Sequence, residues 1–180
     1  MPEAAQALLV IDVQVGTIDP KVPIDRRVLG NIISLLERAR KRGVPVVYMQ
    51  HHSLDPADTL VPGNADWPIH PDVAPAPGEI VLSKHSSDSF LHTELDRHLR
   101  NLGVGHIAVV GCATHYCVDT TVRSALSHGY DVTLAADGHV TGSDEEIPVE
   151  TVIAHHNRTL AQIAIEDRRI RVLPAAEIVF

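Results

Sequence analysis

Residues 106–118 read HIAVVGCATHYCV, and this stretch decides the fold class. Its first part, His106 to Val110, is a short apolar run that is typical of a buried strand in a parallel sheet. The segment that follows, from Val118 to His128, has the spacing of a helix. A strand that turns directly into a helix is the repeating unit of α/β proteins. The stretch therefore predicts a parallel sheet with helices packed against it.

The turn between that strand and that helix contains two cysteines, Cys112 and Cys117. Backbone amides at a helix N-terminus carry partial positive charge, which stabilises a thiolate and lowers the pKa of a cysteine placed there. The same amides can bind the oxyanion that forms when sulfur attacks a carbonyl group. Most free cysteines are instead small buried hydrophobic residues. This stretch alone leaves a nucleophile and a core cysteine both open.

The rest of the chain repeats this alternation of short apolar runs and longer helical segments. We expect a doubly wound single domain over residues 1–180, with six strands and about five helices. Its six-stranded, mainly parallel sheet should carry helices on both faces. The expected strands lie at residues 7–11, 45–50, 79–83, 107–111, 131–136 and 170–173. The expected helices lie at residues 25–42, 93–102, 118–128 and 148–164.

One long segment breaks the alternation. Residues 51–78 hold half of the 12 prolines and show little periodicity. We therefore expect a surface excursion, and loops of this length in a compact domain are often functional.

The charge balance limits the partners of the protein. A formal net charge of −8 and a pI near 5.8 argue against a broad basic face for nucleic acid or anionic membranes. No apolar run approaches the roughly 20 residues that cross a bilayer, and Met1-Pro2-Glu3 lacks the basic start of a signal peptide. Residues 103–108 match G-x-G-x-x-A but precede a strand, which excludes a dinucleotide site. Two cysteines are too few for a disulfide framework. We expect a reduced, cytoplasmic enzyme.

Three chemically active side chains, Asp12, Lys84 and Cys117, each lie just past the carboxyl end of an expected strand. In a doubly wound sheet the carboxyl ends of the strands form the edge where ligands bind, so we expect these residues to meet. There Lys84 would favour a thiolate, Asp12 would move a proton, and Cys117 would attack a carbonyl carbon. Taken singly, Asp12 could be a turn carboxylate, Lys84 a surface charge and Cys117 a core residue.

The same segments resemble those of the isochorismatase-like cysteine hydrolases. The resemblance rests on ALLVIDVQ at residues 7–14, on Ser83 and Lys84 followed by Phe90, and on GCATHYCVDTT at residues 111–121. It extends over nearly the whole chain.

This resemblance implies a three-layer Rossmann-like α/β fold with a six-stranded sheet, and an assembly that is a homodimer or homotetramer. It implies a catalytic triad of Asp12, Lys84 and Cys117. It also implies a cis peptide bond between Cys112 and Ala113, with the amides of Ala113 and Cys117 as the oxyanion hole.

The implied reaction is hydrolysis of a small amide, ureide or lactam through a thioester on Cys117, with no cofactor. Asp12 would take the thiol proton and later give it to the leaving nitrogen. Two alternatives remain open. A vinyl ether hydrolase of the isochorismatase type would use Asp12 without the sulfur. A thiol sensor, or a silent binding protein, would perform no hydrolysis and would at most oxidise Cys117.

Nicotinamide-hydrolysing relatives carry an aromatic residue five positions after the aspartate and an Asp-x-His pair that binds a metal. Here these positions hold Thr17 and the run Gln50-His51-His52. We therefore expect no bound metal. The excursion still carries His51, His52 and His70, which is the number of histidines that a three-ligand zinc site uses.

Five residues are candidates for the wall of the substrate pocket: His51, Trp67, Phe90, His115 and Tyr116. Core packing is the simpler role for Phe90, and His115 could cap the helix instead. On the late expected helix, His155-His156-Asn157 indicates a subunit contact or an ordinary helix face.

Overall fold

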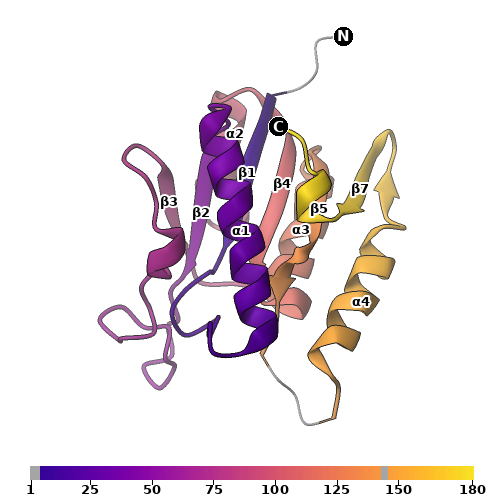
Figure 1. Cartoon of the computed structure of the whole chain (residues 1–180). Coiled ribbons are helices and arrows are strands. Elements are labelled where there is room, and N and C mark those ends of the chain that lie inside the picture. The colour runs from indigo at the N-terminus through magenta and orange to yellow at the C-terminus, as the bar shows by residue number, and fades with distance from the viewer. Residues whose placement is uncertain (1–4, 143–145) are drawn as a thin grey trace.

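The computed structural model describes residues 5–142 and 146–180, which build one seven-stranded sheet (Figure 1). The strand order across the sheet is β3-β2-β1-β4-β5-β7-β6. The first six strands in this order run parallel, and β6 pairs antiparallel with β7. The bounds are β1 Ala5–Ile11, β2 Val46–His51, β3 Ile80–Lys84, β4 Val104–Cys112, β5 Asp131–Val140, β6 Ala164–Ile165 and β7 Arg168–Leu173.

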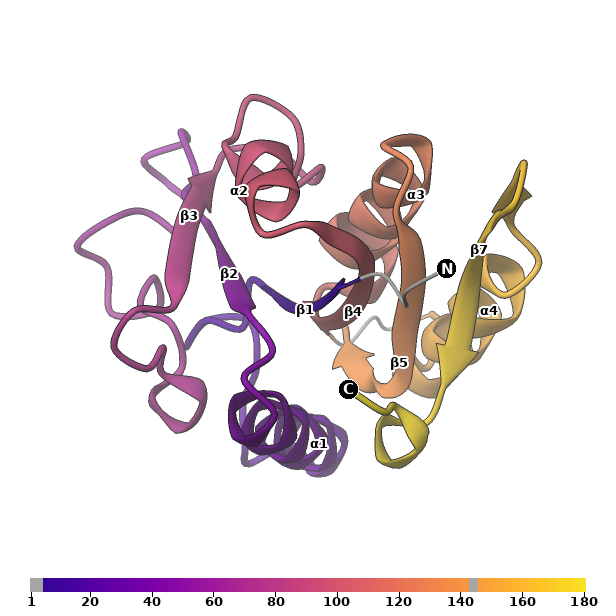
Figure 2. The same ribbon diagram turned by 90° about the horizontal axis from the view of Figure 1, so that it is seen from above.

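Helices cover both faces of the sheet, as the sequence predicts. Helix α1 and the short turn η3 lie on one face, and α2 and α3 lie on the other (Figure 2). Helix α4 packs against β5, β7 and the turn η2. The bounds are α1 Pro23–Lys41, η1 Pro71–Val73, α2 Leu95–Asn101, η2 Thr114–Val118, α3 Asp119–Ser127, α4 Val149–Leu160 and η3 Ala175–Glu177.

The central strand β1 is buried on both faces, because its side chains alternate between two apolar layers. Leu8 and Val10 join the cluster under α1, which includes Ile32 of that helix. Leu9 and Ile11 join the cluster under α2 and α3. This explains why β1 reads as a continuous apolar run instead of an alternating one.

The expectation of six strands is wrong by one. Helix α4 ends at Leu160 and not near residue 164, and the chain then forms a hairpin in which Ala164 and Ile165 pair with β7. A two-residue strand is too short to show any alternation of apolar and polar residues. Its first residue was therefore expected to belong to the end of the helix. Strand β5 is also longer than expected and reaches Val140.

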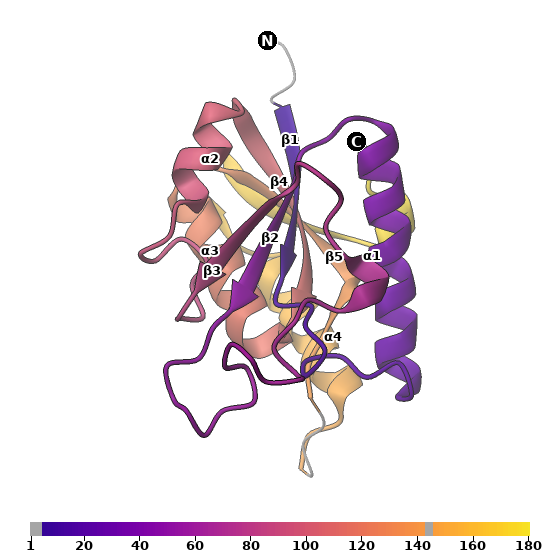
Figure 3. The ribbon, with the colours of Figure 1, turned by 90° about the vertical axis from the view of Figure 1, so that its left-hand side faces the viewer.

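The carboxyl ends of the parallel strands meet at one edge, where the excursion after β2 folds. Figure 3 shows this excursion looping below the ends of β2 and β3. Strands β1 and β4 approach each other closely at the same edge. A Cβ atom on Gly111 would lie 2.0 Å from the Ile11 carbonyl oxygen, and the φ of Gly111 is +136°. Only glycine fits there.

Within the described residues, no helix is both long and apolar enough to cross a membrane. The N-terminal residues Met1–Glu3, whose composition argued against a signal peptide, lie outside the described part of the chain.

Candidate active site

Strand β1 delivers Asp12 to the edge where the strand ends meet. The Asp12 amide donates to the Met49 carbonyl at 2.9 Å, and the Asp12 carbonyl accepts from the Thr17 hydroxyl at 2.6 Å. Its φ of +49° lies in the left-handed region, which is uncommon for residues other than glycine. The residue is only 2% exposed, so its carboxylate lies in a medium of low dielectric constant.

Lys84, the last residue of β3, places its ammonium group at the centre of the site. Its Nζ lies 2.7 Å from Asp12 Oδ2, 3.2 Å from Cys117 Sγ and 2.8 Å from the Ser86 carbonyl oxygen. A fourth neighbour is His51 Nδ1 at 3.4 Å. The lysine is 1% exposed. The sequence-based expectation that the three strand-end residues converge is therefore met by the geometry.

Cys117 lies in η2, one turn of π-helix between β4 and α3. π-Helical turns are rare in proteins, and those that do occur are often found at functional sites. The two cysteines differ in environment. Cys112 is fully buried in the core layer under α1, and this burial raises the pKa of its thiol. Both cysteines contribute atoms to the wall of one cavity, but only Cys117 is partly exposed. The sequence did not decide whether these cysteines are nucleophiles or core residues. Cys117 is the one that a substrate can reach.

The resting sulfur is a neutral thiol. Burial, followed by the charge of Asp12, raises the pKa of Cys117 to about 11, and the smaller opposing effect of Lys84 does not reverse this. Lys84 favours the thiolate, as expected, but burial and Asp12 outweigh it, so the thiol proton has to be removed before the sulfur can attack. Burial also raises the pKa of Asp12, against the influence of Lys84. Burial thus makes Asp12 a stronger proton acceptor than an ordinary carboxylate.

A proton can pass from Cys117 to Asp12 without changing the total charge of the site. Before the transfer the charges are Asp12⁻ and Lys84⁺, and afterwards they are the thiolate and Lys84⁺. Asp12 Oδ1 is buried and has no hydrogen-bond partner among residues 5–142 and 146–180. It is therefore available as the proton acceptor. Burial and the charge of Lys84 lower the pKa of His51, which keeps its ring neutral near pH 7.

Metal binding does not fit this arrangement. One ligand atom each from Asp12, His51 and Cys117 lies within 4.8 Å of the others, a spacing that could hold an ion. The Lys84 ammonium lies within 3.4 Å of all three groups and would repel a cation. His52 does not belong to this cluster, and its ring contacts that of Trp67.

His70, the third histidine of the possible zinc set, is also committed elsewhere. Its Nδ1 accepts from the Asp72 amide at 3.3 Å. The cation at the centre of the site is therefore the ammonium group of Lys84 and not a metal ion.

A cavity of about 260 Å³ opens above the sulfur. It is lined by Asp12, Thr17, His51, Asp58, Leu60, Ser87, Cys112, Ala113, Tyr116 and Cys117. The Cys112–Ala113 peptide bond is cis, as the resemblance implied. The Ala113 amide has no acceptor among the described residues and belongs to the same wall as Cys117. It can therefore donate to an oxyanion formed in this cavity.

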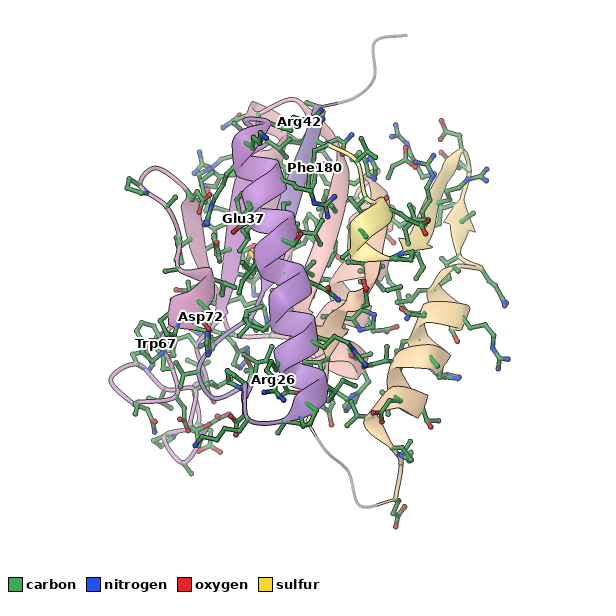
Figure 4. All side chains as sticks on the ribbon, viewed as in Figure 1. Arg26, Glu37, Arg42, Trp67, Asp72 and Phe180 are labelled. Carbon is green, nitrogen blue, oxygen red and sulfur yellow. The ribbon has the colours of Figure 1, made fainter. Side chains whose placement is uncertain are left out.

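Two of the expected pocket residues, His51 and Tyr116, line the cavity, whereas Trp67 and Phe90 do not. Phe90 is buried in the core, where its ring stacks on His128 at 4.5 Å and on Tyr130 at 5.9 Å between centroids. Trp67 lies on the excursion (Figure 4). Its backbone carbonyl accepts hydrogen bonds from the side chains of Gln14 and Gln50.

His115, the fifth expected pocket residue, faces a different cavity. It forms a hydrogen bond of 3.0 Å with Thr141 and lines a hollow of about 400 Å³ together with His155 and His156 of α4. Tyr116, its neighbour in sequence, faces the cavity above Cys117. Because η2 is a single π-helical turn, adjacent residues point into separate hollows.

Sequence reasoning missed Gln14, which fastens the excursion to the sheet. Its Oε1 accepts from the His51 amide at 2.8 Å, and its Nε2 donates to the carbonyls of His51 at 3.1 Å and Trp67 at 2.6 Å. Gln14 is fully buried. A polar residue inside an apolar stretch, two positions after Asp12, was the available signal.

A buried chain of hydrogen bonds behind η2 was also missed. Asn157 Nδ2 donates to the Ala136 carbonyl, so its Oδ1 accepts from His139 Nε2 at 2.9 Å. His139 Nδ1 then accepts from the Thr114 hydroxyl at 2.9 Å. These hydrogen bonds link η2, the turn that carries Cys117, to α4. Burial lowers the pKa of His139, which keeps the ring neutral.

Comparison with known proteins gives matches over most of the chain. The family model described as the isochorismatase domain matches residues 6–165. Two streptothricin hydrolase sequences from Streptomyces noursei are each 36% identical over 175 residues, which is 95% of this chain and 69% and 63% of theirs. Nicotinamidase 3 from Arabidopsis thaliana is 29% identical over 153 residues, 77% of this chain and 75% of that protein.

Solved structures agree with the sequence matches. An isochorismatase from Pseudomonas putida KT2440 superimposes with a TM-score of 0.81 at 28% identity, covering 99% of this chain and 94% of that one. The chain spans only part of the length of the streptothricin hydrolases, about two thirds.

Proposed function

This chain belongs to the isochorismatase family of hydrolases, and from that premise we propose that it hydrolyses the C–N bond of a small amide, ureide or lactam through a thioester on Cys117. The observation that carries the proposal is the position of Lys84, whose Nζ lies 2.7 Å from the Asp12 carboxylate and 3.2 Å from the Cys117 sulfur at the floor of one cavity. The names of two relatives, streptothricin hydrolase and nicotinamidase, support an amide as the bond that is cleaved.

The first half of the reaction forms the thioester. Asp12 accepts the proton of the Cys117 thiol, and the sulfur adds to the carbonyl carbon of the amide. The amides of Ala113 and Cys117 donate to the oxyanion while Lys84 balances the charge. The C–N bond then breaks, and the leaving nitrogen takes the proton from Asp12. Ammonia or an amine departs, and the acyl group remains on the sulfur.

The second half releases the acid. Asp12, again a carboxylate, removes a proton from a water molecule, whose oxygen attacks the thioester carbon. The same amides hold the second oxyanion. When the C–S bond breaks, the sulfur recovers its proton from Asp12, and the carboxylic acid leaves. The site returns to its starting charges.

The pocket favours this reaction over the vinyl ether alternative. Isochorismate carries two carboxylate groups, which would require cationic side chains. In the part of the chain that the structure describes, no lysine or arginine lines the cavity, and the nearby Lys84 is already paired with Asp12.

The test is a panel of small amides, ureides and lactams assayed for ammonia or amine release. The Cys117→Ala variant should lose at least about a thousandfold in kcat/KM, since it lacks the nucleophile. Mass spectrometry of the quenched wild-type enzyme should place an acyl adduct on the peptide of Cys117. The fully buried Cys112 serves as the internal control.

A Cys117→Ala variant that keeps its activity while Asp12→Asn loses it would support the ether-hydrolase reading instead. Absence of hydrolysis together with reversible oxidation of Cys117 would support a thiol sensor. The expected homodimer or homotetramer, the cytoplasmic location and the lack of nucleic-acid or membrane partners remain predictions.

A further inference from the structure

The wall of the cavity above Cys117 includes residues from two segments that lie far apart in the sequence. The excursion contributes Asp58 and the half-buried Leu60, and η2 contributes Tyr116. The Tyr116 ring is 59% exposed and is backed by the His115 ring at 4.0 Å between centroids. An aromatic face held in place by a neighbouring ring is a surface on which a cationic group binds favourably.

Asp58 is fixed in its orientation. Its Oδ1 accepts a hydrogen bond of 2.9 Å from the Leu60 amide, which closes a tight turn of the loop. This bond, with a smaller contribution from the Ser53 hydroxyl, lowers the pKa of Asp58, so the carboxylate stays ionised near neutral pH.

The charges of the cavity do not cancel. Asp12 is neutralised by Lys84 at 2.7 Å, and His51 is held neutral by burial and by Lys84. Among the described residues that line the cavity, Asp58 is then the one charge without a counterion in the site, and no lysine or arginine joins it. A bound molecule therefore meets a net negative charge at the mouth and a neutral proton-transfer site at the floor.

We infer that the enzyme selects amides that carry a positive charge, with the amide bond above Cys117 and the cationic group between Asp58 and Tyr116. Asp58 is then a specificity-determining residue that takes no part in the chemistry. This inference rests on the proposed function, because it names the substrate class of the same site.

The size of the effect follows from the exposure of the pair. Ion pairs between exposed groups contribute little because water and salt screen them. We therefore expect Asp58 to give a preference of about twofold for a cationic over a neutral ligand, and of about fivefold for a cationic over an anionic one, both decreasing as salt is added.

The first experiment measures the charge preference of the cavity without any turnover. Cys117 is modified with two matched methanethiosulfonates, one with a trimethylammonium-ethyl group and one with a sulfonatoethyl group. Each rate is divided by the rate of the same reagent with 2-mercaptoethanol. The fully buried Cys112 should not react, and peptide mass spectrometry checks this. The wild-type protein should favour the cationic reagent.

The variants isolate Asp58. Asp58→Asn keeps an oxygen that can accept from the Leu60 amide, so the loop is preserved while the charge is lost. The cation-to-anion ratio should then fall about fivefold, and Asp58→Lys should reverse the preference. Asp55→Asn is the matched control, since Asp55 makes the same turn with the Ala57 amide at 2.9 Å in the same loop but does not line the cavity. Its ratio should equal that of the wild type.

The second experiment compares 6-aminohexanamide, heptanamide and adipamic acid, three amides of similar length that are cationic, neutral and anionic. Ammonia release should be most efficient with the cation, and Asp58→Asn should remove this advantage through KM with little change in kcat. Equal labelling ratios in the wild type and Asp58→Asn would overturn the inference, even if all three amides were hydrolysed. An intact labelling ratio with no ammonia from any of the amides would count against the amidase proposal and leave Asp58 as the cation-selecting residue.

Discussion

Replacing Lys84 by methionine tests the buried ion pair on which the proposed chemistry depends. The substitution keeps an apolar stem of similar length and removes the ammonium group that lies 2.7 Å from Asp12 Oδ2. Both partners are almost fully buried. Removing one member of such a pair typically costs about 3–5 kcal/mol of unfolding free energy, because the other charge stays buried without a partner. The variant should also lose at least about a thousandfold in activity.

The loss of stability should depend on pH, and its sign follows from Asp12. Burial already raises the pKa of this carboxyl group in the folded protein, and Lys84 opposes that rise. Without Lys84 the folded-state pKa rises further above the unfolded value. A group of this kind favours the folded state in acid and loses that contribution as pH rises through its folded pKa. Each unit of additional pKa shift is worth about 1.4 kcal/mol. The deficit of Lys84→Met should therefore be small near pH 4 and largest near pH 8.

Urea unfolding of four proteins measures these quantities: the wild type, Lys84→Met, Asp12→Asn and the double variant. The double variant should be more stable than the sum of the single losses predicts, because no unpaired charge remains. Lys41→Met, at an exposed position in α1, is the matched control and should change stability by less than about 0.5 kcal/mol. Additivity within about 0.5 kcal/mol, or a Lys84→Met deficit that is the same at both pH values, would refute the reasoning.

Three further predictions concern the framework of the site. Gln14→Ala removes three hydrogen bonds to the excursion. It should lower the free energy of unfolding in urea by about 2–3 kcal/mol and speed proteolysis within residues 52–69. Unchanged cleavage would contradict the role of Gln14 in holding the excursion. Gly111→Ala should destabilise by more than about 4 kcal/mol, since its Cβ would collide with the backbone of β1, whereas Gly30→Ala, which has open space in α1, should stabilise by about 0.5–1 kcal/mol; equal effects on thermal unfolding would refute this. Burial lowers the pKa of His139 below its usual 6.5 in the folded protein. The unfolded chain therefore protonates this ring more readily than the folded protein does, and stability falls as pH drops below about 6.5. His139→Gln should weaken this acid loss by about 1.4 kcal/mol for each unit of the shift, and an unaltered pH profile would exclude the residue as its source.

The fold and the reactive residues could be predicted because parallel sheets obey a simple rule. Once strands were assigned near Asp12, Lys84 and Cys117, their common location at the carboxyl edge followed from topology alone. No side-chain detail was needed for that step. The resemblance then supplied the cis bond at Cys112 and Ala113, which the structure contains.

The errors arose where the outcome depends on distances that a sequence does not contain. Lys84 favours the Cys117 thiolate, as expected, but the sequence does not show that burial and Asp12 outweigh it. Phe90 and His115 were candidates for the pocket wall, with core packing and helix capping as their alternatives. Side chains a few residues apart face different layers of the fold, and only the coordinates assign them. Asp58 lies in a segment without periodicity, so no pattern could identify it.

The constant charge of the triad has a consequence for how the reaction is insulated. When a proton moves between sulfur and carboxylate, the negative charge shifts only between two groups that both lie beside the same fixed ammonium group. Solvent reorganisation, which usually adds to the barrier of a proton transfer in water, then contributes little. A chain with this centre can exclude bulk water during acyl transfer and admit the single molecule that the second half requires.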